Sequence, residues 1–345
     1  MIRRQGPLRA GGAREYRWQG GRLRVVQWFC SMRPRLTYDN ATPHWGELPR
    51  SLLGGLLRRM WKQRWAYVLL TPHLAYFGLF VFYPVVRAVW YSFMRVGLRR
   101  AQWLGLANYT HLLEDELFAK ALKVTTIYTL TYVPIGLILA VILAGLIYQL
   151  SPRLQTFFKS GLYLPGVVSS VAVGMIWVWM YHPNNGLLNY MLSRVGLGPY
   201  QWLQSPTMAL PSVIFMSVLM SFGSPVVLLT ASMGAIPTTL YEVAEMDGAG
   251  KIRQFWSITL PLLKPTLLYL LVVRTIGSYQ VFESVYVMTR GGPYYATSTL
   301  VYSIYTTAFL DLRFGYASAK AIVLFLIVVT LSIIQFKFLS TDVEY

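Results

Sequence analysis

Long apolar runs alternate with short polar stretches along most of the chain. Six such runs extend roughly over residues 65–91, 124–150, 160–181, 208–233, 262–288 and 316–338. Each reaches the length of about 20 residues that a helix needs to cross a bilayer. The runs at 124–150 and 160–181 contain no charged residue. The pattern predicts an all-α polytopic membrane protein with six transmembrane helices.

Composition supports this class, and the distribution of charge orients the chain. Of the 345 residues, 55% are hydrophobic and 13% are charged, whereas soluble domains carry about 25% charged residues. Fourteen of the 31 lysines and arginines fall within the first 64 residues, and such residues collect on the cytoplasmic side of membrane helices. We therefore expect a multi-pass protein of the cell (inner) membrane with both termini in the cytoplasm.

The region before the first run is rich in arginine and glycine. We expect residues 1–60 to form a disordered cytoplasmic tail and residues 61–345 to form the transmembrane domain. A formal net charge of +18 would suit a nucleic-acid partner in a soluble protein. A Gly/Arg-rich tail is more often simply solvated, so we predict no nucleic-acid partner. The composition of the rest of the chain predicts contact with the lipid bilayer instead.

Few residues offer covalent or metal chemistry. Cys30 is the only cysteine, and the four histidines show no i,i+4 spacing, so we predict neither a metal site nor a catalytic site. The stretch GAGK at 248–251 lacks the earlier glycine and the following Ser or Thr that a phosphate-binding loop requires. We therefore predict a chain that has no cofactor, is not an enzyme and does not itself bind ATP.

A polar segment between the fourth and fifth runs has a local pattern of its own. Thr239 and Glu242 have the spacing of a capping box, which predicts the start of a short helix. Asp247 and Gly248 predict a turn, because glycine readily adopts the left-handed conformation that closes a helix. A second short helix, KIRQFWSI, is expected to follow. The segment either only packs on the bundle or is a rigid docking element for a partner.

This segment resembles the EAA-loop signature of the membrane subunits of binding-protein-dependent ABC importers. The matching positions are Glu242, Ala244, Asp247, Gly248, Ala249, Phe255, Ile258, Leu260 and Pro261. Val243 stands where the motif name has its first alanine. Two further segments, 184–203 and 288–319, are similar to the segments after the third and fifth spans of carbohydrate-uptake permeases of the maltose, lactose and glycerol-3-phosphate type.

The resemblance implies a fold, a function and a set of partners. The fold is that of a type I ABC importer permease, in which the first short helix of the loop is a coupling helix that sits in a cleft of an ATPase subunit. Such a permease works with a second, homologous permease, an ATPase dimer and an extracytoplasmic solute-binding protein. The implied function is passage of a sugar or sugar-like solute, such as a glycerol phosphate, driven by ATP hydrolysis on a separate subunit.

Ionisable residues inside a predicted span are candidates for contact with a solute. Arg274 and Glu283 lie on opposite faces of the fifth predicted helix, so each needs a partner elsewhere. One stripe at i, i+4, i+8 and i+11 holds Thr275, Tyr279, Glu283 and Tyr286. Tyrosine rings stack on the C–H face of a sugar and a carboxylate accepts hydrogen bonds from its hydroxyls, which makes the stripe a candidate solute path. The alternative is that these residues only join neighbouring helices.

A stand-alone secondary transporter or channel is the alternative function. That class predicts inverted repeats and buried acidic proton sites in several spans. The sequence shows no internal repeat, and Glu283 is the one acidic residue that we expect to be buried in a span. The pattern therefore favours the importer permease.

Overall fold

The computed structural model describes residues 64–97 and 101–339. The chain divides into two units, Met1–Leu69 and Leu70–Tyr345, and the architecture described below is that of the second unit. The predicted tail at 1–60 lies outside the described residues. Its disorder and the predicted domain boundary therefore stay predictions.

Three stretches of the described chain are continuous helices long and apolar enough to cross a membrane. The first consists of α2 (Arg64–Phe77), a π-helical turn at Gly78–Phe82 and α3 (Tyr83–Ser92). The others are α5 (Glu116–Tyr148), which continues through Pro134, and α17 (Phe314–Leu339). They agree with the first, second and sixth predicted runs.

The other three predicted spans are bent pairs of helices. These pairs are α6 (Pro152–Tyr163) with α7 (Ser170–Met180), α9 (Ala209–Met220) with α10 (Gly223–Gly234), and Lys251–Leu262 with Lys264–Met288. The axes within them meet at 92°, 44° and 64°. The run at 160–181 is thus not one helix, because a 3-10 turn at Leu164–Val167 containing a proline and a glycine interrupts it. The number of spans is six only if each pair crosses once, so that count stays a prediction.

The remaining elements are the segments of the third bent pair and the short helices and strands that connect the spans. The helical ones are α4 (Ala107–Glu114), α8 (Leu187–Ser193), α11 (Thr238–Met246), α12 (Lys251–Gln254), a π-helical turn (Phe255–Thr259), α13 (Leu260–Leu262), α14 (Lys264–Tyr279), α15 (Glu283–Met288), α16 (Leu300–Tyr305) and a second π-helical turn (Thr306–Leu310). Two strands, β1 (Met94–Val96) and β2 (Ala101–Trp103), form an antiparallel ribbon with Met94 opposite Trp103. The all-α prediction missed this ribbon, which is too short to change the fold class.

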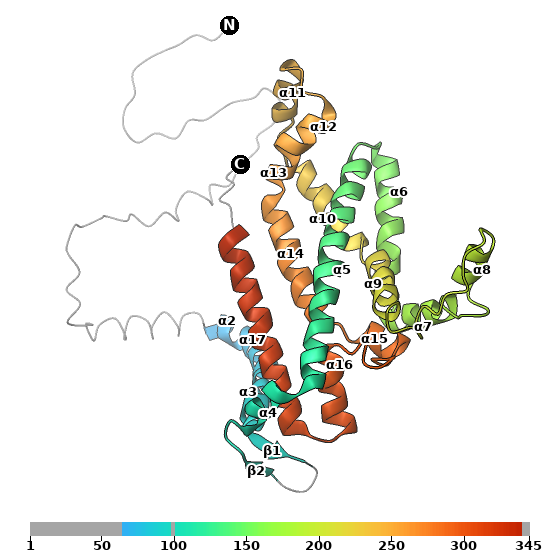
Figure 1. Ribbon diagram of the computed structural model, residues 1–345. Coiled ribbons are helices and arrows are strands. Elements are labelled where there is room, and N and C mark those ends of the chain that lie inside the picture. The colour runs from blue at the N-terminus through green and yellow to red at the C-terminus, as the bar shows by residue number, and fades with distance from the viewer. Residues whose placement is uncertain (1–63, 98–100, 340–345) are drawn as a thin grey trace, which may run out of the picture. The chain divides into compact units, whose positions relative to one another are not determined.

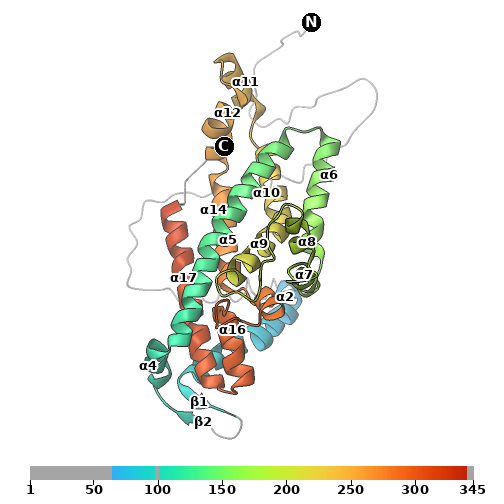
Figure 2. The ribbon, with the colours of Figure 1, turned by 45° about the vertical axis from the view of Figure 1, so that its right-hand side comes forward.

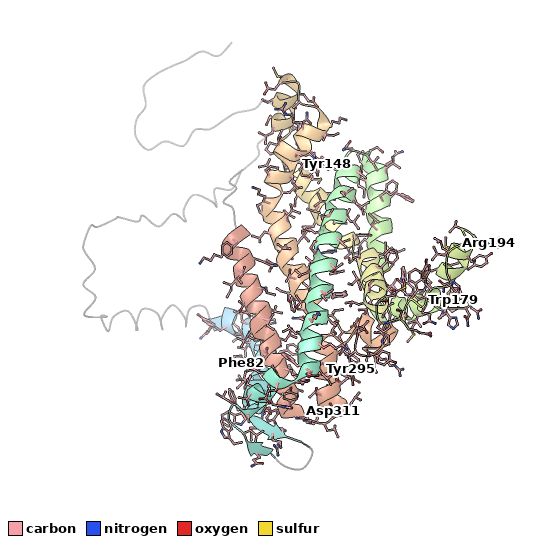
Figure 3. All side chains as sticks on the ribbon, viewed as in Figure 1. Phe82, Tyr148, Trp179, Arg194, Tyr295 and Asp311 are labelled. Carbon is pink, nitrogen blue, oxygen red and sulfur yellow. The ribbon has the colours of Figure 1, made fainter. Side chains whose placement is uncertain are left out.

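Helix α5 is the element on which the second unit is built. Figures 1 and 2 show α5 beside α14 and α10, with α17 packed on α14 and on α3. Helices α11 and α12 lie at one end of this bundle, and the β-ribbon and α4 lie at the other. Tyr148 and Asp311 mark the two ends in Figure 3.

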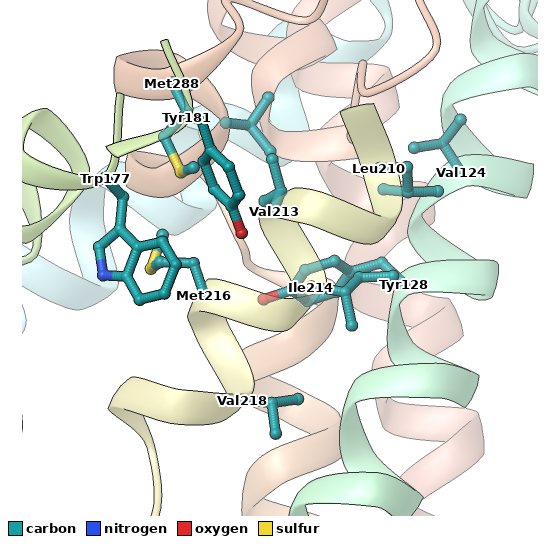
Figure 4. Packing of buried hydrophobic residues seen from close by; sticks show 11 residues of the cluster. Val124, Tyr128, Trp177, Tyr181, Leu210, Val213, Ile214, Met216, Val218 and Met288 are labelled. Carbon is teal, nitrogen blue, oxygen red and sulfur yellow. The ribbon is translucent and has the colours of Figure 1, made fainter. Parts of the chain in front are cut away.

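Small residues let α5 approach its neighbours closely. Ala140 and Ala144 have no exposed surface and pack in one cluster with Leu229 and Met233 of α10. Lipid tails are as apolar as leucine, so helix association in a bilayer depends on such close packing and on interhelical hydrogen bonds. A second cluster, drawn in Figure 4, joins Tyr128 of α5 to residues of α7, α9 and α15. Both clusters fix the helices that carry the breaks.

Candidate functional site

A pocket of about 440 Å³ opens where interrupted helices meet. It is lined by residues of α5, the bend before α7, α9 and the break between α14 and α15, namely Tyr128, Tyr132, Pro165, Gly166, Val168, Ser170, Val173, Met216, Ser217, Met220, Gln280, Val281, Phe282, Glu283 and Ser284. Irregular backbone at membrane depth is tolerated where it is buried in protein or lines a cavity. The pocket therefore explains why the backbone is irregular at two places, the bend before α7 and the break between α14 and α15.

The break between α14 and α15 positions Glu283 at this pocket. Helix α14 ends at Tyr279, and Glu283 is the first residue of α15. The Glu283 side chain is exposed rather than buried, and it accepts a hydrogen bond from the Ser170 hydroxyl of α7. The expectation that Glu283 would be buried in a continuous helix is wrong, because three irregular residues at 280–282 precede it.

The break also divides the predicted stripe, so its four members do not share one face. Thr275 and Tyr279 are buried between helices: the Thr275 hydroxyl accepts a 2.9 Å hydrogen bond from Gln335 of α17, and the Tyr279 hydroxyl lies 3.3 Å from that of Thr126 of α5. Tyr286 stacks on Phe282 at 5.3 Å instead. Glu283 alone of the four lines the pocket, and a role in solute passage stays a prediction for all of them.

Two tyrosines of α5 belong to the pocket and were not predicted. The rings of Tyr128 and Tyr132 are stacked 5.4 Å apart at 18°. Arg274 lies over the Tyr132 ring at 5.4 Å and donates to the carbonyl oxygen of Ser221 at the end of α9. Arg274 and Glu283 thus find separate partners, as predicted. The i,i+4 tyrosine pair in an uncharged run was the available signal, but only the tertiary structure shows which face meets the cavity.

At one end of the bundle, α11 presents an exposed surface. No residue of α11 is buried, and Val243 and Met246 are 58% and 88% exposed. The predicted short helix is confirmed. The predicted capping box is wrong, because α11 begins at Thr238 after Pro237 and its N-terminus has no side-chain hydrogen bond. Pro237 occupies the capping position with ψ 129°, and its ring has no oxygen that could accept from the first N–H groups of the helix.

The end of α11 is closed by a Schellman turn. Gly248 has φ +77°, its N–H donates to the carbonyl of Glu245 at 3.0 Å, and the N–H of Ala249 donates to that of Ala244 at 2.8 Å. Ala244 and Ala249 are half-buried behind this turn, while Glu242, Asp247 and Gly248 are exposed. The predicted turn is confirmed. The left-handed conformation at Gly248 explains why a glycine stands at that position.

Side-chain hydrogen bonds fasten α11 to the elements that follow it. The Tyr241 hydroxyl lies 2.9 Å from that of Thr259, and Gln254 donates to the carbonyl of Ala249 at 2.9 Å. The first bond links α11 to the π-helical turn after α12, and the second ties α12 to the turn between the two short helices. Helices α11 and α12 are therefore held as one stiff projection that continues through α13 into α14.

The opposite end of the bundle holds a cluster of charged and polar side chains that was not predicted. Asp115 caps α5 by accepting from the N–H groups of Leu117 and Phe118 at 2.9 and 3.1 Å. Its other carboxylate oxygen accepts from the Tyr316 hydroxyl at 2.6 Å and lies 3.5 Å from the buried amine of Lys320. The cluster joins the start of α5 to α17.

The carboxyl group of Asp115 titrates below its ordinary range. Burial raises its pKa, but the Tyr316 hydroxyl, the N–H groups of Phe118 and Leu117 and the charge of Lys320 together outweigh burial, and the net pKa is lowered. The ionised form of Asp115 is therefore the form that the folded chain stabilises.

Comparison with known proteins identifies the family. The model of the family described as binding-protein-dependent transport system inner membrane component matches residues 133–340. This match covers more than half of the chain, and the chain belongs to that family. It is a multi-pass permease component of the inner membrane, a transport protein rather than an enzyme. The membership decides in favour of the importer permease and against a stand-alone secondary transporter or channel.

Individual relatives agree over most of their length. The chain is 35% identical to the sulfoquinovosyl glycerol transport system permease protein SmoG of Agrobacterium fabrum over 281 residues. This alignment covers 80% of this chain and 90% of the relative. It is 34% identical to the sn-glycerol-3-phosphate transport system permease protein UgpA of the same organism, over 81% and 96% of the two chains.

A solved structure confirms the type of fold. The chain superimposes with a TM-score of 0.74 and 25% identity on a chain of a bacterial ABC transporter involved in the import of the acidic polysaccharide alginate. The match covers 83% of this chain and 99% of that one. The fold is accordingly that of an ABC importer permease, as the sequence predicted.

Proposed function

We propose that this permease forms, with a second homologous permease, the path of a sugar or sugar-like solute, and that ATP hydrolysis on a separate ATPase dimer drives the transport. The observation that carries the proposal is α11, an exposed helix held stiffly at one end of a bundle that carries an open pocket with both apolar and polar lining residues. The solutes named for the two relatives, sulfoquinovosyl glycerol and sn-glycerol-3-phosphate, support a carbohydrate or polyol derivative.

In this proposal α11 is the element that the ATPase grips. Exposed Glu242 and Asp247 supply polar contacts and exposed Val243 and Met246 supply apolar ones. Ala244, Gly248 and Ala249 keep the turn behind them compact. A stiff contact is needed for rigid-body coupling between subunits. Since α11 and α12 continue through α13 into α14, displacement of α11 would reach the break that carries Glu283.

The proposal also orients the chain. The end with α11 would face the cytoplasm, together with both termini, and the end with the β-ribbon and α4 would face an extracytoplasmic solute-binding protein. Pocket access from that side would let solute enter from the binding protein. The concentration of lysine and arginine in the first 64 residues supports the same orientation.

The first test is affinity capture of the full-length chain from its native membranes in mild detergent, with mass spectrometry of the co-purifying proteins. We expect an ABC ATPase and a second permease. Recovery of the chain alone, able to transport in liposomes without ATP, would contradict the proposal.

A cross-linking test locates the contact. Replacing Cys30, the only cysteine, by serine allows a single new cysteine to be placed at Met246 or, as a control, at Phe309. Phe309 is 63% exposed and lies two residues before Asp311, which Figure 3 shows at the opposite end. We expect a thiol cross-linker to join the ATPase to Met246→Cys and not to Phe309→Cys. Equal cross-linking from both positions would show that α11 is not the docking element.

A variant test separates coupling from folding. Gly248→Asp places a side chain on a residue with φ +77°, whereas Gly250→Asp places one on a residue with φ −67°, and a Cβ at either position meets nothing within 4 Å. We expect Gly248→Asp to abolish stimulation of the captured ATPase by transport while the membrane helices stay folded. Gly250→Asp should retain it, and loss in both variants would assign the effect to charge alone.

A further inference from the structure

We propose that the pocket takes a neutral, hydroxyl-rich solute and that Glu283 is the residue that disfavours anionic ones; this rests on the proposed function. Glu283 supplies the one acidic side chain among the described lining residues, and no described lysine, arginine or histidine lines the pocket. The lining therefore offers a solute a carboxylate and no basic side chain.

The basic side chain behind the tyrosine wall, Arg274, is engaged through one nitrogen, whereas its buried Nη1 has no hydrogen-bond partner among the described residues. Arg274 donates to the Ser221 carbonyl and lies over the Tyr132 ring. A Cβ at Gly136 would be 2.3 Å from its Nη1, so the guanidinium is packed against the backbone of α5. Arg274 is not among the residues that line the pocket. Its positive charge supports the tyrosine wall rather than offering a bidentate site to a phosphate or sulfonate.

The remaining lining suits a sugar or polyol. The half-buried rings of Tyr132 and Phe282 border the pocket, and aromatic rings pack against C–H groups. Tyr128 is 3% exposed and supports the Tyr132 ring from behind. Ser217 and Gln280 offer hydroxyl and amide groups at the same cavity. A carboxylate accepts charge-assisted hydrogen bonds from two solute hydroxyls. Each of these groups recognises an uncharged polyhydroxyl compound without needing a counter-charge.

An anionic solute would meet repulsion at the same position. Two like charges about 7 Å apart at an effective dielectric constant of about 20, as near a protein surface, repel enough to weaken binding on the order of 10-fold or more. The relatives named above are assigned to sulfoquinovosyl glycerol and sn-glycerol-3-phosphate, and the solved transporter imports an acidic polysaccharide. All three solutes are anions at neutral pH. The pocket chemistry thus predicts a different charge class for this chain.

A matched pair of probes tests the proposal directly. Sulfoquinovosyl glycerol carries a sulfonate where glucosylglycerol carries a hydroxyl, and the two are otherwise alike. The captured permease, together with the subunits that co-purify with it, can be reconstituted in lipid nanodiscs and titrated with each probe by saturation-transfer NMR. We expect glucosylglycerol to bind about 10-fold more tightly than the sulfonate.

Variants assign the preference to one residue. Glu283→Gln should tighten binding of the sulfonate about 10-fold and change that of glucosylglycerol by no more than about 3-fold. Glu245→Gln, which removes an exposed carboxylate from α11 outside the pocket, should change neither. Equal effects of the two variants would overturn the role of Glu283.

Three other outcomes would also overturn the proposal. The first is binding of the sulfonate as tight as that of glucosylglycerol, or tighter, because that result would place Arg274 rather than Glu283 in control. The second is a preference that stays unchanged in Glu283→Gln. Absence of signal from both probes at tens of millimolar would reject a sugar site here. Capture of the ATPase in the same preparation would then show that the permease assignment stands and only the pocket assignment fails.

Discussion

Two acidic residues at different levels of the bundle, Asp115 and Glu283, are held in opposite ways. Asp115 accepts from two backbone N–H groups and the Tyr316 hydroxyl and lies 3.5 Å from the Lys320 amine, which is itself buried. Glu283 is exposed at a pocket, with the Ser170 hydroxyl as its hydrogen-bond donor. The first carboxylate has its charge neutralised within the chain, whereas the second faces a cavity that a solute can fill.

The difference separates a structural charge from a functional one. A buried ion pair is costly to desolvate, and its partners must all be present for it to be stable. Asp115 and Lys320 meet this condition, since Lys320 also donates to Ser303 and Thr307 at 3.1 Å. A carboxylate that borders a cavity retains acceptor capacity for a ligand. The number and burial of partners, rather than the presence of a charge in an apolar region, therefore indicates function.

The largest effect is expected from Lys320→Met. Removing one partner of a buried pair leaves the other uncompensated, and we expect a loss of about 3 kcal/mol in the free energy of unfolding. Thermal unfolding of the purified chain in detergent measures it. Lys337→Met, which removes an exposed lysine near the end of the same helix, is the control and should change stability little. A similar loss in both variants would show that the cluster is not the cause.

A somewhat smaller effect is expected from Gly223→Ala, at the start of α10 and three residues after Met220 of the pocket lining. A Cβ there would lie 2.4 Å from the Cα of Tyr163 and 2.6 Å from the carbonyl oxygen of Leu162, both backbone atoms of α6. Overpacking against backbone should cost about 2 kcal/mol and displace the turn that carries Pro165. Unfolding and probe binding should both change.

The matched control for that variant is Gly234→Ala in the same helix, where a Cβ meets nothing within 4 Å. Its stability should stay the same or rise slightly, because alanine has the higher helix propensity. If Gly223→Ala is equally harmless, α6 and α10 can separate without loss, and the pocket wall is less firmly built than the Asp115 cluster.

Sequence reasoning found much of this arrangement, and its failures have a common cause. The exposed helix and the turn at Gly248 were predicted correctly because their signals are local. Lys320 was missed although it is an ionisable residue in an apolar run, and Glu283 was expected to be buried although it is exposed. Burial depends on which helix faces meet, and a break at 280–282 without proline or glycine gives no local signal.

The Asp115 cluster also predicts a dependence of stability on pH. The pKa of Asp115 is lowered in the folded chain, so at pH values near its ordinary pKa of about 4 the unfolded chain binds more protons than the folded one. The stabilisation from Asp115 is therefore complete above that pH and is lost as the pH falls through the lowered pKa. The difference in unfolding temperature between wild type and Asp115→Asn should shrink in this range.

A pH-independent difference between those two chains would contradict the assignment. Lys320→Met offers a further check, because it removes the charge that contributes to the lowered pKa. In that background the loss of stability should begin near the same pH but end at a higher pH than in the wild type, and it should be smaller. The hydrogen bonds from Phe118 and Leu117 remain, so the shift should be reduced and not abolished.

The smallest effect on stability is expected from Glu283→Gln. The substitution keeps the shape of the side chain and a group that can bond to Ser170, and the position is exposed, so the free energy of unfolding should change by no more than about 0.5 kcal/mol. Asp115→Asn is the matched change at the other site and should cost clearly more, because the amide cannot replace a carboxylate that accepts on both oxygens beside Lys320. Thermal unfolding of the two variants in one detergent compares them directly. If Glu283→Gln destabilised the chain as much as Asp115→Asn, Glu283 would be one more structural acid, and its position at the pocket would carry no meaning for the solute. A stable Glu283→Gln chain with altered probe preference would instead show that this carboxylate serves the ligand and not the fold.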